Sequence, residues 1–318
     1  MKILVTGATG FVGQALCQRL LETGHAVRCA IRGGEGGAAL PAGCETSVVG
    51  SIGPETYWAE AVKGTELVIH LAARVHVMRE SVPDPLAEFR KVNTEGTRRL
   101  AESAAAHGVK RLVYISTIKV NGEKSDAPFR ESDRPAPQDP YGISKFEAES
   151  VLWEIGKRSG LEIVVIRPPL IYGPGVKANF RNLMNIVHRG VPLPFGTIRN
   201  HRRMVYLGNL VDIILCCSWH PSAAGEVFLA GDEESVSTPE LVARIAESMG
   251  KKARLVSVPA GLIKWAGRIS GKSAAVERLF GDLNLDIGKL EAKLGWKPPY
   301  DMKSGLRTTA EWFLAARS

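Results

Sequence analysis

The sequence predicts an α/β protein built on a doubly wound parallel sheet, with a smaller α/β domain toward its C-terminal end. Two observations in the 318 residues support this prediction. Short apolar runs alternate with amphipathic helical stretches through the first half, as expected for parallel strands that are buried on both faces. A glycine-rich turn stands between the first apolar run and the first helical stretch, which is where such folds bind phosphate groups.

The period of the apolar residues gives the order of the elements. In the helical stretches, apolar residues recur near positions i, i+3, i+4 and i+7, and the first stretch closes on Gly24. The strand candidates are short apolar runs rich in Val, Ile and Leu. Strands are predicted at 2–7, 25–31, 65–73, 110–117 and 161–168, and helices at 10–24, 93–108 and 144–160.

The rhythm of strands and helices ends after residues 167–169, where Gly and Pro become frequent. We therefore expect a first domain at 1–168 and a second, substrate-binding domain at 169–318. The first corresponds to the doubly wound sheet. The second is predicted to consist of loops, short strands and helices.

The amino-acid composition restricts the kinds of ligand and the cellular compartment that we expect for this protein. The net charge of +8 suits an anionic small molecule, and the scattered distribution of Lys and Arg argues against nucleic acid as a partner. The five cysteines show no metal-ligand spacing, so we expect reduced thiols in a cytoplasmic protein and no metal. The N-terminus resembles a strand and turn rather than a signal peptide. No apolar run approaches the ~20 residues that span a bilayer.

The glycine-rich turn, TGATGFVG at 6–13, has the spacing of a dinucleotide-binding fingerprint of the Rossmann type. Gly7 is expected to allow the tight turn and Gly10 to let the backbone approach a pyrophosphate. Gly13 is expected to permit close packing of the helix on the strand. The N-terminus of the helix then presents N–H groups and a positive dipole end to the anion.

Arg32 ends the second predicted strand, about 20 residues after the turn. In dinucleotide-binding folds the residue at this position contacts the ribose of the cofactor. An acidic residue there would bind the 2′-hydroxyl of NAD, whereas an arginine can pair with a 2′-phosphate. We therefore favour NADP(H), with NAD(H) as the alternative. In that alternative Arg32 is a solvated residue before a loop, and Glu35 of the same loop approaches the ribose.

Tyr141 and Lys145 are four residues apart at the start of a predicted helix, so both side chains are expected on one face. A lysine cation near a phenol favours the phenolate and lowers the pKa of the phenol. This spacing therefore predicts an acid/base tyrosine.

Taken together, these motifs resemble the extended short-chain dehydrogenase/reductase family, which includes nucleotide-sugar epimerases, dehydratases and reductases. The resemblance runs nearly end to end. It rests on residues 6–13, HLAA at 70–73, Asn93 in VNTEGT, Ser116-Thr117, Tyr141 and Lys145, Arg167-Pro168, YGPG at 172–175, Arg202 in RRMVYLGNLVD and LGW at 294–296. It implies that a segment around 203–232 returns to the first, Rossmann domain and that 169–318 binds a nucleotide sugar.

The resemblance also implies roles for residues. Thr117, Tyr141 and Lys145 would form the catalytic triad, unless the Thr117 hydroxyl only caps a backbone group. The family often has an aspartate at the adenine contact, where this chain has Gly50, Ser51 and Ile52, so that contact is expected to be weaker or to come from the backbone. The implied cofactor contacts are Gly7, Thr9, Gly10, Phe11, Val12, Gly13, Arg32, Ser51, Ile52, Leu71, Ala72, Ala73, Asn93, Ser116, Tyr141, Lys145, Arg167 and Pro168.

The implied substrate is a UDP-sugar. Asn179 matches an asparagine near the diphosphate, Leu193, Pro194 and Phe195 match the strand beside the uracil, and Arg202 and Arg278 match arginines that clamp the diphosphate. Either arginine is otherwise a surface charge. The stretch STIKVNGE resembles a subgroup of bacterial surface-polysaccharide enzymes that act on UDP-N-acetylhexosamines. In it, Lys119 and Asn121 either face the sugar or are structural.

The resemblance is compatible with two activities. The first is NADPH-dependent reduction at C4 of a UDP-4-keto-6-deoxy-N-acetylhexosamine, and the alternative is a 4-epimerase of UDP-glucose or UDP-N-acetylglucosamine with bound NAD. Both use the same triad, and Arg32 favours the reductase. A 4,6-dehydratase is disfavoured because Ile118 and Lys119 occupy the positions of its acidic pair. The resemblance further implies a homodimer that pairs through the helices after Asn93 and Tyr141.

Overall fold

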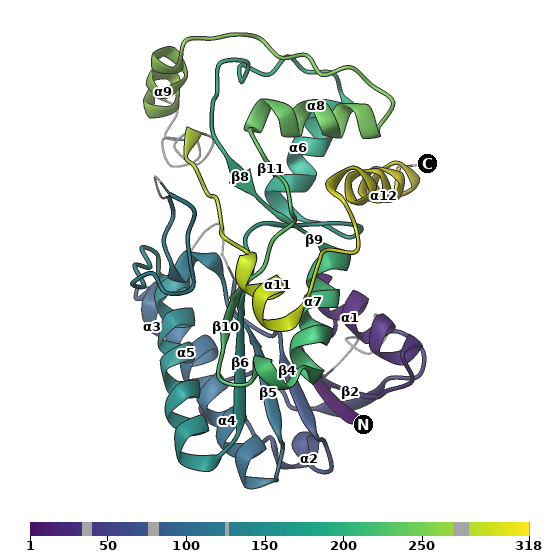
Figure 1. The fold of residues 1–318 in the computed structure, drawn as a ribbon, viewed down its shortest axis with the longest axis vertical. Helices are drawn as coiled ribbons and strands as arrows, with labels where there is room; N and C mark the ends of the chain where they lie inside the picture. Colours follow the sequence, from purple (N-terminus) through teal and green to yellow (C-terminus); the bar gives the residue numbers. More distant parts are fainter. Residues whose placement is uncertain (34–39, 76–82, 125–126, 270–279, 318) are drawn as a thin grey trace.

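The computed structural model describes residues 1–33, 40–75, 83–124, 127–269 and 280–317 (Figure 1). Its largest element is a seven-stranded parallel sheet with the strand order β10-β6-β5-β4-β1-β2-β3. The chain runs outward from β1 in one direction through β2 and β3, and then in the other through β4, β5 and β6. The strands are β1 (Lys2–Thr6), β2 (Ala26–Ile31), β3 (Glu45–Val48), β4 (Leu67–His70), β5 (Arg111–Ile115), β6 (Glu162–Arg167) and β10 (Val227–Leu229).

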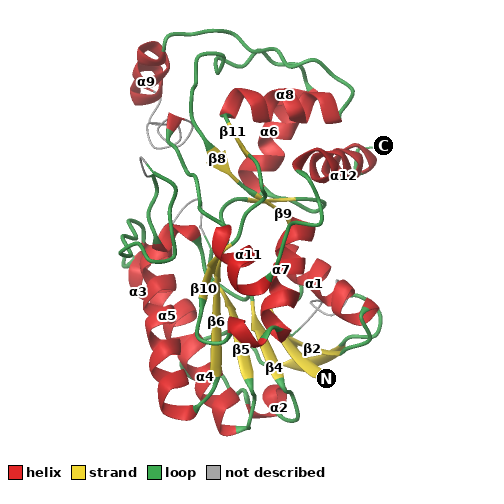
Figure 2. Ribbon diagram, in the orientation of Figure 1, coloured by secondary structure: helices red, strands yellow, loops and turns green. Residues whose placement is uncertain are grey.

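Helices cover both faces of this sheet, as Figure 2 shows. The side chains of one strand alternate between the two apolar layers: Ile3 and Val5 pack on one face and Leu4 on the other. One face carries α1 (Phe11–Glu22), α7 (Leu207–Trp219), the 3₁₀ helix η4 (Pro221–Ala223) and α11 (Gly288–Leu294). The other carries α2 (Ala59–Val62), α4 (Gly96–Ala106) and α5 (Pro140–Ser159). α3 (Pro85–Phe89) and the π-helix η2 (Arg90–Glu95) pack beside α5.

A second group of elements lies beyond the carboxyl ends of the strands (Figure 1). It has its own apolar cluster, which includes Phe180, Ile245 and Phe313. Its helices are α6 (Ala178–His188), α8 (Thr238–Ser248), α9 (Ala260–Ile269) and α12 (Met302–Ala315). Its short strands pair as β7 (Ile171–Tyr172) with β9 (Val205–Tyr206) and β8 (Arg202–Arg203) with β11 (Ser235–Val236).

The chain passes between the two groups more than once. After β6 it enters the smaller group, and it then returns through α7 and β10, which pairs in parallel with β6. Residues of α7 such as Leu210 and Ile214 are completely buried against the sheet. The apolar character of α7 is therefore that of a packed core helix. None of the helices in the described ranges is long and apolar enough to cross a membrane.

Candidate functional site

A cavity of about 710 Å³ lies at the carboxyl ends of the central strands, where the strand order reverses. Ligands of doubly wound folds bind at this position. Most of the cofactor residues predicted from the sequence line it together with Thr117. They are Gly7, Thr9, Gly10, Phe11, Val12, Gly13, Arg32, Ile52, Leu71, Ala72, Ala73, Ser116, Tyr141, Lys145 and Pro168.

The glycine-rich turn between β1 and α1 forms one wall of the cavity. Gly7 has a φ of +71°, and a Cβ there would lie 2.7 Å from the backbone nitrogen of Ala72. A Cβ on Gly13 would lie 2.2 Å from the carbonyl oxygen of Gly7. Gly7 thus serves both the turn and the close approach of the loop after β4, and Gly13 allows the helix to pack on the turn.

Gly10 is the N-cap residue of α1, and no side chain caps this helix. Its own amide donates to the carbonyl oxygen of Gly7 at 2.9 Å, which closes the turn. The first-turn N–H groups of α1 and the positive end of its dipole therefore suit a phosphate group. A dinucleotide pyrophosphate fits this cradle because Gly10 has no side chain, whereas a Cβ there would lie 3.1 Å from the carbonyl oxygen of Gly7.

The loop after β4 forms the opposite wall and is held by buried polar groups. The Thr6 hydroxyl accepts a hydrogen bond from the Ala72 amide at 3.2 Å and lies 2.6 Å from Nδ1 of His70. Nε2 of His70 lies 2.9 Å from the hydroxyl of Thr97. Burial lowers the pKa of His70 to about 3, so the ring is neutral. Thr6, the first residue of the glycine-rich stretch, and Thr97 hold this loop through His70, and the sequence pattern did not reveal the role of Thr97.

Arg32 lines the far end of the cavity, after β2, and its side chain is exposed. Arg32 and Lys145 are the basic residues of the described lining, which contains no Asp or Glu. Arg28, four residues earlier, serves another purpose: its guanidinium binds Glu45 at 2.9 Å and the carbonyl oxygens of Glu60, Ala61 and Lys63. Glu35 lies outside the described residues.

At the other end of the cavity, Thr117, Tyr141 and Lys145 lie together. Asp139 is the N-cap of α5 and accepts from the Gly142 amide at 2.7 Å, which fixes the first turn that carries Tyr141. The Thr117 hydroxyl accepts from the Lys119 amide at 3.3 Å and thus caps the 3₁₀ helix η3 (Ile118–Val120) while it lines the cavity.

Lys145 is only 1% exposed, and its Nζ donates to the carbonyl oxygen of Ile115 at 2.6 Å. The same atom lies 4.0 Å from the centre of the Tyr114 ring. Burial lowers the pKa of Lys145 to about 7, although Glu149 acts in the opposite direction. Burial and the nearby Asp139 carboxylate raise the pKa of Tyr141.

The expectation that Lys145 lowers the pKa of Tyr141 is therefore wrong for this arrangement. The physical reason is that burial acts on both groups and disfavours the charged form of each. The Lys145 amine donates a hydrogen bond to the carbonyl oxygen of Ile115. Because its pKa is about 7, much of its positive charge is lost at neutral pH. Tyr141 is consequently a neutral phenol, which is a proton donor.

The low pKa of Lys145 predicts a pH dependence of stability. An exposed lysine has a pKa near 10.4, so unfolding takes up a proton between about pH 7 and that value. We expect the free energy of unfolding of the wild type, relative to Lys145→Met, to rise with pH across this window and to fall toward pH 7. Urea unfolding of both proteins, without added cofactor, measures the difference. A difference that does not change with pH would contradict the buried, neutral lysine.

A buried network lies behind the cavity and includes Glu149, which the sequence reasoning missed. Glu149 is 1% exposed, and it binds Arg167 through Oε1 at 3.0 Å and Oε2 at 2.5 Å. Its Oε1 also accepts from the Ser116 hydroxyl. Arg167 donates to Oδ1 of Asn121 at 2.9 Å, and Nδ2 of Asn121 donates to the carbonyl oxygen of Arg130 at 2.8 Å.

This network gives different roles to two predicted contacts. Arg167 was expected at the cofactor and Asn121 was a candidate for the sugar, yet neither lines the cavity. Both residues are buried. The Arg167 guanidinium donates hydrogen bonds to Asn121 and to Glu149. They support Ser116 and the end of β5 from behind. The signal that was available is the position of Glu149, four residues after Lys145 and therefore on the same face of the predicted helix.

Asn93 and Ser51 are also absent from the described cavity lining. Asn93 is 1% exposed in η2, and its side-chain amide brackets the backbone of Arg74 with bonds of 2.8 and 3.0 Å. It also donates to the Ser144 hydroxyl at 3.0 Å. Asn93 therefore ties the loop after β4 to α5. The Ser51 side chain is exposed, while its neighbours Gly50 and Ile52 line the cavity.

The predicted sugar and diphosphate residues lie outside this cavity, mostly in the smaller group of elements. Asn179 is exposed in the first turn of α6, next to Ala178, whose φ is 51°. Leu193 is buried and forms an isolated β-bridge with Leu255. Pro194 and Phe195 follow it in the sequence.

The charged candidates among the described residues have partners within the protein. Arg202 donates to the carbonyl oxygen of Gly281 at 3.1 Å. Lys119 pairs with Asp139 and, at 2.9 Å, with Glu123. Arg278 lies outside the described residues.

The seven-stranded sheet, the glycine cradle and the Tyr-x-x-x-Lys pair on α5 define an enzyme of the extended short-chain dehydrogenase/reductase class. The sequence model of the NAD-dependent epimerase/dehydratase family matches residues 3–231. The chain belongs to this family.

Comparison with known proteins agrees with this assignment. A UDP-glucose 4-epimerase of Vibrio cholerae is 44% identical, with 99% of this chain and 96% of the relative aligned. The N-acetyl-alpha-D-glucosaminyl-diphospho-ditrans,octacis-undecaprenol 4-epimerase of Escherichia coli O157:H7 is 29% identical over 98% of this chain and 94% of the relative. Among solved structures, the UDP-glucuronic acid 4-epimerase of Bacillus cereus, in complex with UDP-glucuronic acid and NAD, superimposes with a TM-score of 0.80. It is 25% identical and covers 99% of this chain and all of its own.

Proposed function

We propose that this protein is an NADP(H)-dependent oxidoreductase that reduces the C4 ketone of a UDP-4-keto-6-deoxy-N-acetylhexosamine. The observation that carries the proposal is the position of Arg32 at the end of a cavity whose described lining holds no carboxylate. In the reduction, hydride adds to C4 and the ketone oxygen takes up a proton. The product is the corresponding 4-hydroxy sugar, which supplies surface-polysaccharide synthesis.

The charges of the cavity support NADP(H) over NAD(H). A 2′-phosphate adds negative charge where NAD has only a hydroxyl, and Arg32 can meet it with a bidentate pair. An acidic residue at the same point would repel that phosphate. The pyrophosphate would lie against the N-terminus of α1, and Lys145 would reach the nicotinamide ribose.

The state of Tyr141 supports the direction of the reaction. When bound, the cofactor supplies the hydride. Tyr141 is a neutral phenol because burial and Asp139 raise its pKa, so it can donate its proton to the C4 oxygen. The Thr117 hydroxyl would hydrogen-bond the same oxygen and orient it. Lys145, with a pKa of about 7, can return a proton toward Tyr141 at neutral pH.

For the substrate, we propose that the smaller group of elements binds UDP. Arg202 would pair with the diphosphate beside Asn179, and Leu193, Pro194 and Phe195 would lie along the uracil. Lys119 follows Thr117 by two residues and pairs with Asp139, and from there it would approach the sugar. We also propose a homodimer that pairs through α4 and α5, which pack together on one face of the sheet.

A second candidate function is a UDP-sugar 4-epimerase with bound NAD. The 44% identity to a UDP-glucose 4-epimerase over nearly the whole chain favours it. In this reaction hydride leaves C4 and returns to the other face of the ring. The same Tyr141 would then act first as a base.

One experiment separates the two functions. The purified protein is incubated with UDP-4-keto-6-deoxy-N-acetylglucosamine and NADPH or NADH, and separately with UDP-glucose or UDP-N-acetylglucosamine without added cofactor. The reductase predicts stoichiometric loss of NADPH absorbance with the keto sugar. Interconversion at C4 without added cofactor, and no NADPH oxidation, would overturn it in favour of the epimerase.

Replacement of Arg32 tests the choice of cofactor. Because charge-assisted hydrogen bonds contribute about 1.5–3 kcal/mol, Arg32→Asp is expected to weaken NADPH by about 10- to 100-fold and to leave NADH nearly unchanged. Fluorescence titration of both cofactors measures this. Arg158→Ala removes an exposed arginine at the far end of α5 and is the control. Equal losses of NADPH and NADH affinity would refute the role of Arg32.

A further inference from the structure

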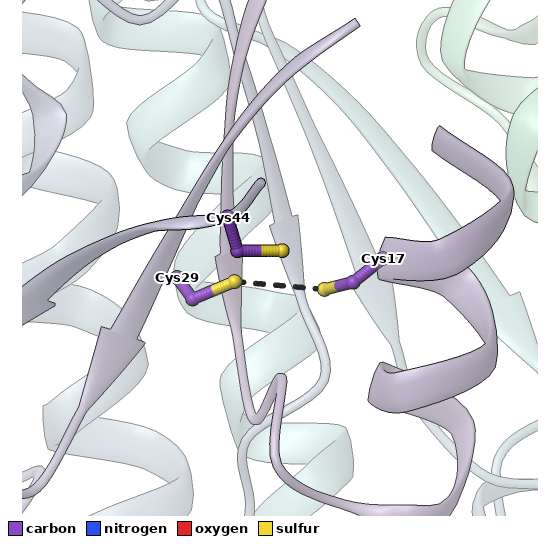
Figure 3. A group of neighbouring side chains, drawn as sticks. All are labelled: Cys17, Cys29 and Cys44. Atoms are coloured by element: carbon purple, nitrogen blue, oxygen red, sulfur yellow. Dashed lines mark hydrogen bonds between the residues drawn. The ribbon is translucent and has the colours of Figure 1, made fainter. Parts of the chain in front are cut away.

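Three cysteine side chains from separate parts of the sequence meet between α1 and β2 (Figure 3). Cys17 projects from α1, Cys29 from β2, and Cys44 stands directly before β3. Their sulfur atoms all lie within 4.8 Å of one another, and the sulfurs of Cys17 and Cys29 are 3.6 Å apart. Cys17 and Cys29 are fully buried, whereas Cys44 is half-buried. The proposed reaction uses none of these thiols.

We propose that Cys17, Cys29 and Cys44 bind one thiophilic monovalent metal ion, Cu(I), through three thiolates. Metal–thiolate bonds are about 2.3 Å long, so the three sulfurs of a trigonal site are about 4.0 Å apart. The observed separations need little adjustment to reach this geometry. The backbone of β2 and α1, which the sheet and helix packing fix, already provides it.

The donor set selects the kind of metal. All three donors in the described group are sulfurs, with no histidine or carboxylate among them. Soft thiolate ligands favour Cu(I), whereas structural zinc sites almost always have four ligands. The surroundings are apolar, since Cys17 and Cys29 belong to the main core cluster, against which Cys44, Leu21 and Leu40 pack. Hard cations such as Mg²⁺, which keep water and oxygen ligands, do not suit this position.

Coordination releases protons to the solvent. A thiophilic cation displaces the proton of each thiol that becomes a ligand, and each displaced proton passes to water. The half-buried Cys44 provides the route of entry.

A bound ion would join three elements around the proposed cofactor site. Cys17 belongs to the helix that begins at the glycine turn, and Cys29 lies three residues before Arg32. Cys44 is at the other end of the segment that follows Arg32. The ion would therefore fix both ends of that segment against α1 and stabilise the folded protein, because it binds the folded state.

An anaerobic titration of the reduced full-length protein tests the site. Cu(I) is supplied as its complex with a chromophoric chelator, and the wild type is expected to withdraw one equivalent. Cys44→Ser and Cys44→Ala should each lower the affinity by more than about 100-fold, since they remove a ligand itself. Cys216→Ser, at a half-buried cysteine outside the cluster, is the matched control and should bind as the wild type does.

The outcomes are distinct. Circular dichroism and the thermal midpoint establish that the variants fold, and Cu(I) should raise the midpoint of the wild type and of Cys216→Ser alone. No withdrawal of Cu(I) by the wild type would overturn the proposal. So would equal withdrawal by the Cys44 variants, or retention of Zn(II) in preference to Cu(I). None of these results depends on the activity of the enzyme.

Discussion

Tyr141→Phe is expected to lower kcat for the reduction of the keto sugar by about 10²- to 10⁴-fold, the usual contribution of a positioned acid. In the proposed reaction the phenol acts as the neutral proton donor, because burial and Asp139 raise its pKa. The substitution removes only the hydroxyl, and the edge contact of its ring with Phe89, at 6.2 Å between centroids, remains. Steady-state kinetics with NADPH and the keto sugar measure the effect.

The control separates chemistry from binding. NADPH affinity and the thermal midpoint of Tyr141→Phe should match those of the wild type, since the cavity loses no cation. Tyr57→Phe, at a tyrosine that is 65% exposed, should retain full activity. If Tyr141→Phe turned over every tested UDP-sugar at the wild-type rate, neither the reductase nor the epimerase mechanism could stand.

Glu149→Gln is expected to destabilise the protein by about 3–5 kcal/mol, because it leaves a buried guanidinium without its carboxylate. Arg167 and Glu149 have side chains that are 5% and 2% exposed. Their two hydrogen bonds, and the one from Ser116, are shielded from solvent and from salt. The free energy of unfolding, from urea titration at constant ionic strength, measures the loss.

Two further variants show whether the pair is the cause. Arg167→Met in the Glu149→Gln background should restore part of the stability, since it removes the unpaired charge and leaves an apolar group of similar length. Glu154→Gln, on the exposed side of the same helix, should change stability by less than about 0.5 kcal/mol. Equal effects of Glu149→Gln and Glu154→Gln would refute a buried ion pair.

The fold class followed from the sequence because each strand and helix has a period that is visible locally. The predicted strands at 2–7, 25–31, 110–117 and 161–168 correspond closely to β1, β2, β5 and β6. The α/β prediction is confirmed by the seven-stranded parallel sheet and by the match to solved epimerases. The short strand β3, with the sequence ETSV, was missed because its side chains are mostly exposed and carry little apolar signal.

The site was less accessible to sequence reasoning. The glycine turn and the Tyr141–Lys145 pair are local features, and both line the cavity. Arg167 and Asn121 have the chemistry of ligand contacts, yet they bind each other and Glu149 behind it. Arg28 lies in β2 and Arg32 directly follows that strand, so the two residues are about 13 Å apart at 3.3 Å per residue. Only Arg32 reaches the cavity.

The sequence by itself determined the family, the glycine-rich turn, the helix that carries Tyr141 and Lys145, and the arginine after β2, since these depend on residues that are close along the chain. Tertiary structure decided which polar groups face the cavity and which form hydrogen bonds with other buried groups behind it. It also brought together Cys17, Cys29 and Cys44. The physical reason is that a buried polar side chain must find partners, and in a parallel sheet those partners come from strands and helices far away in sequence.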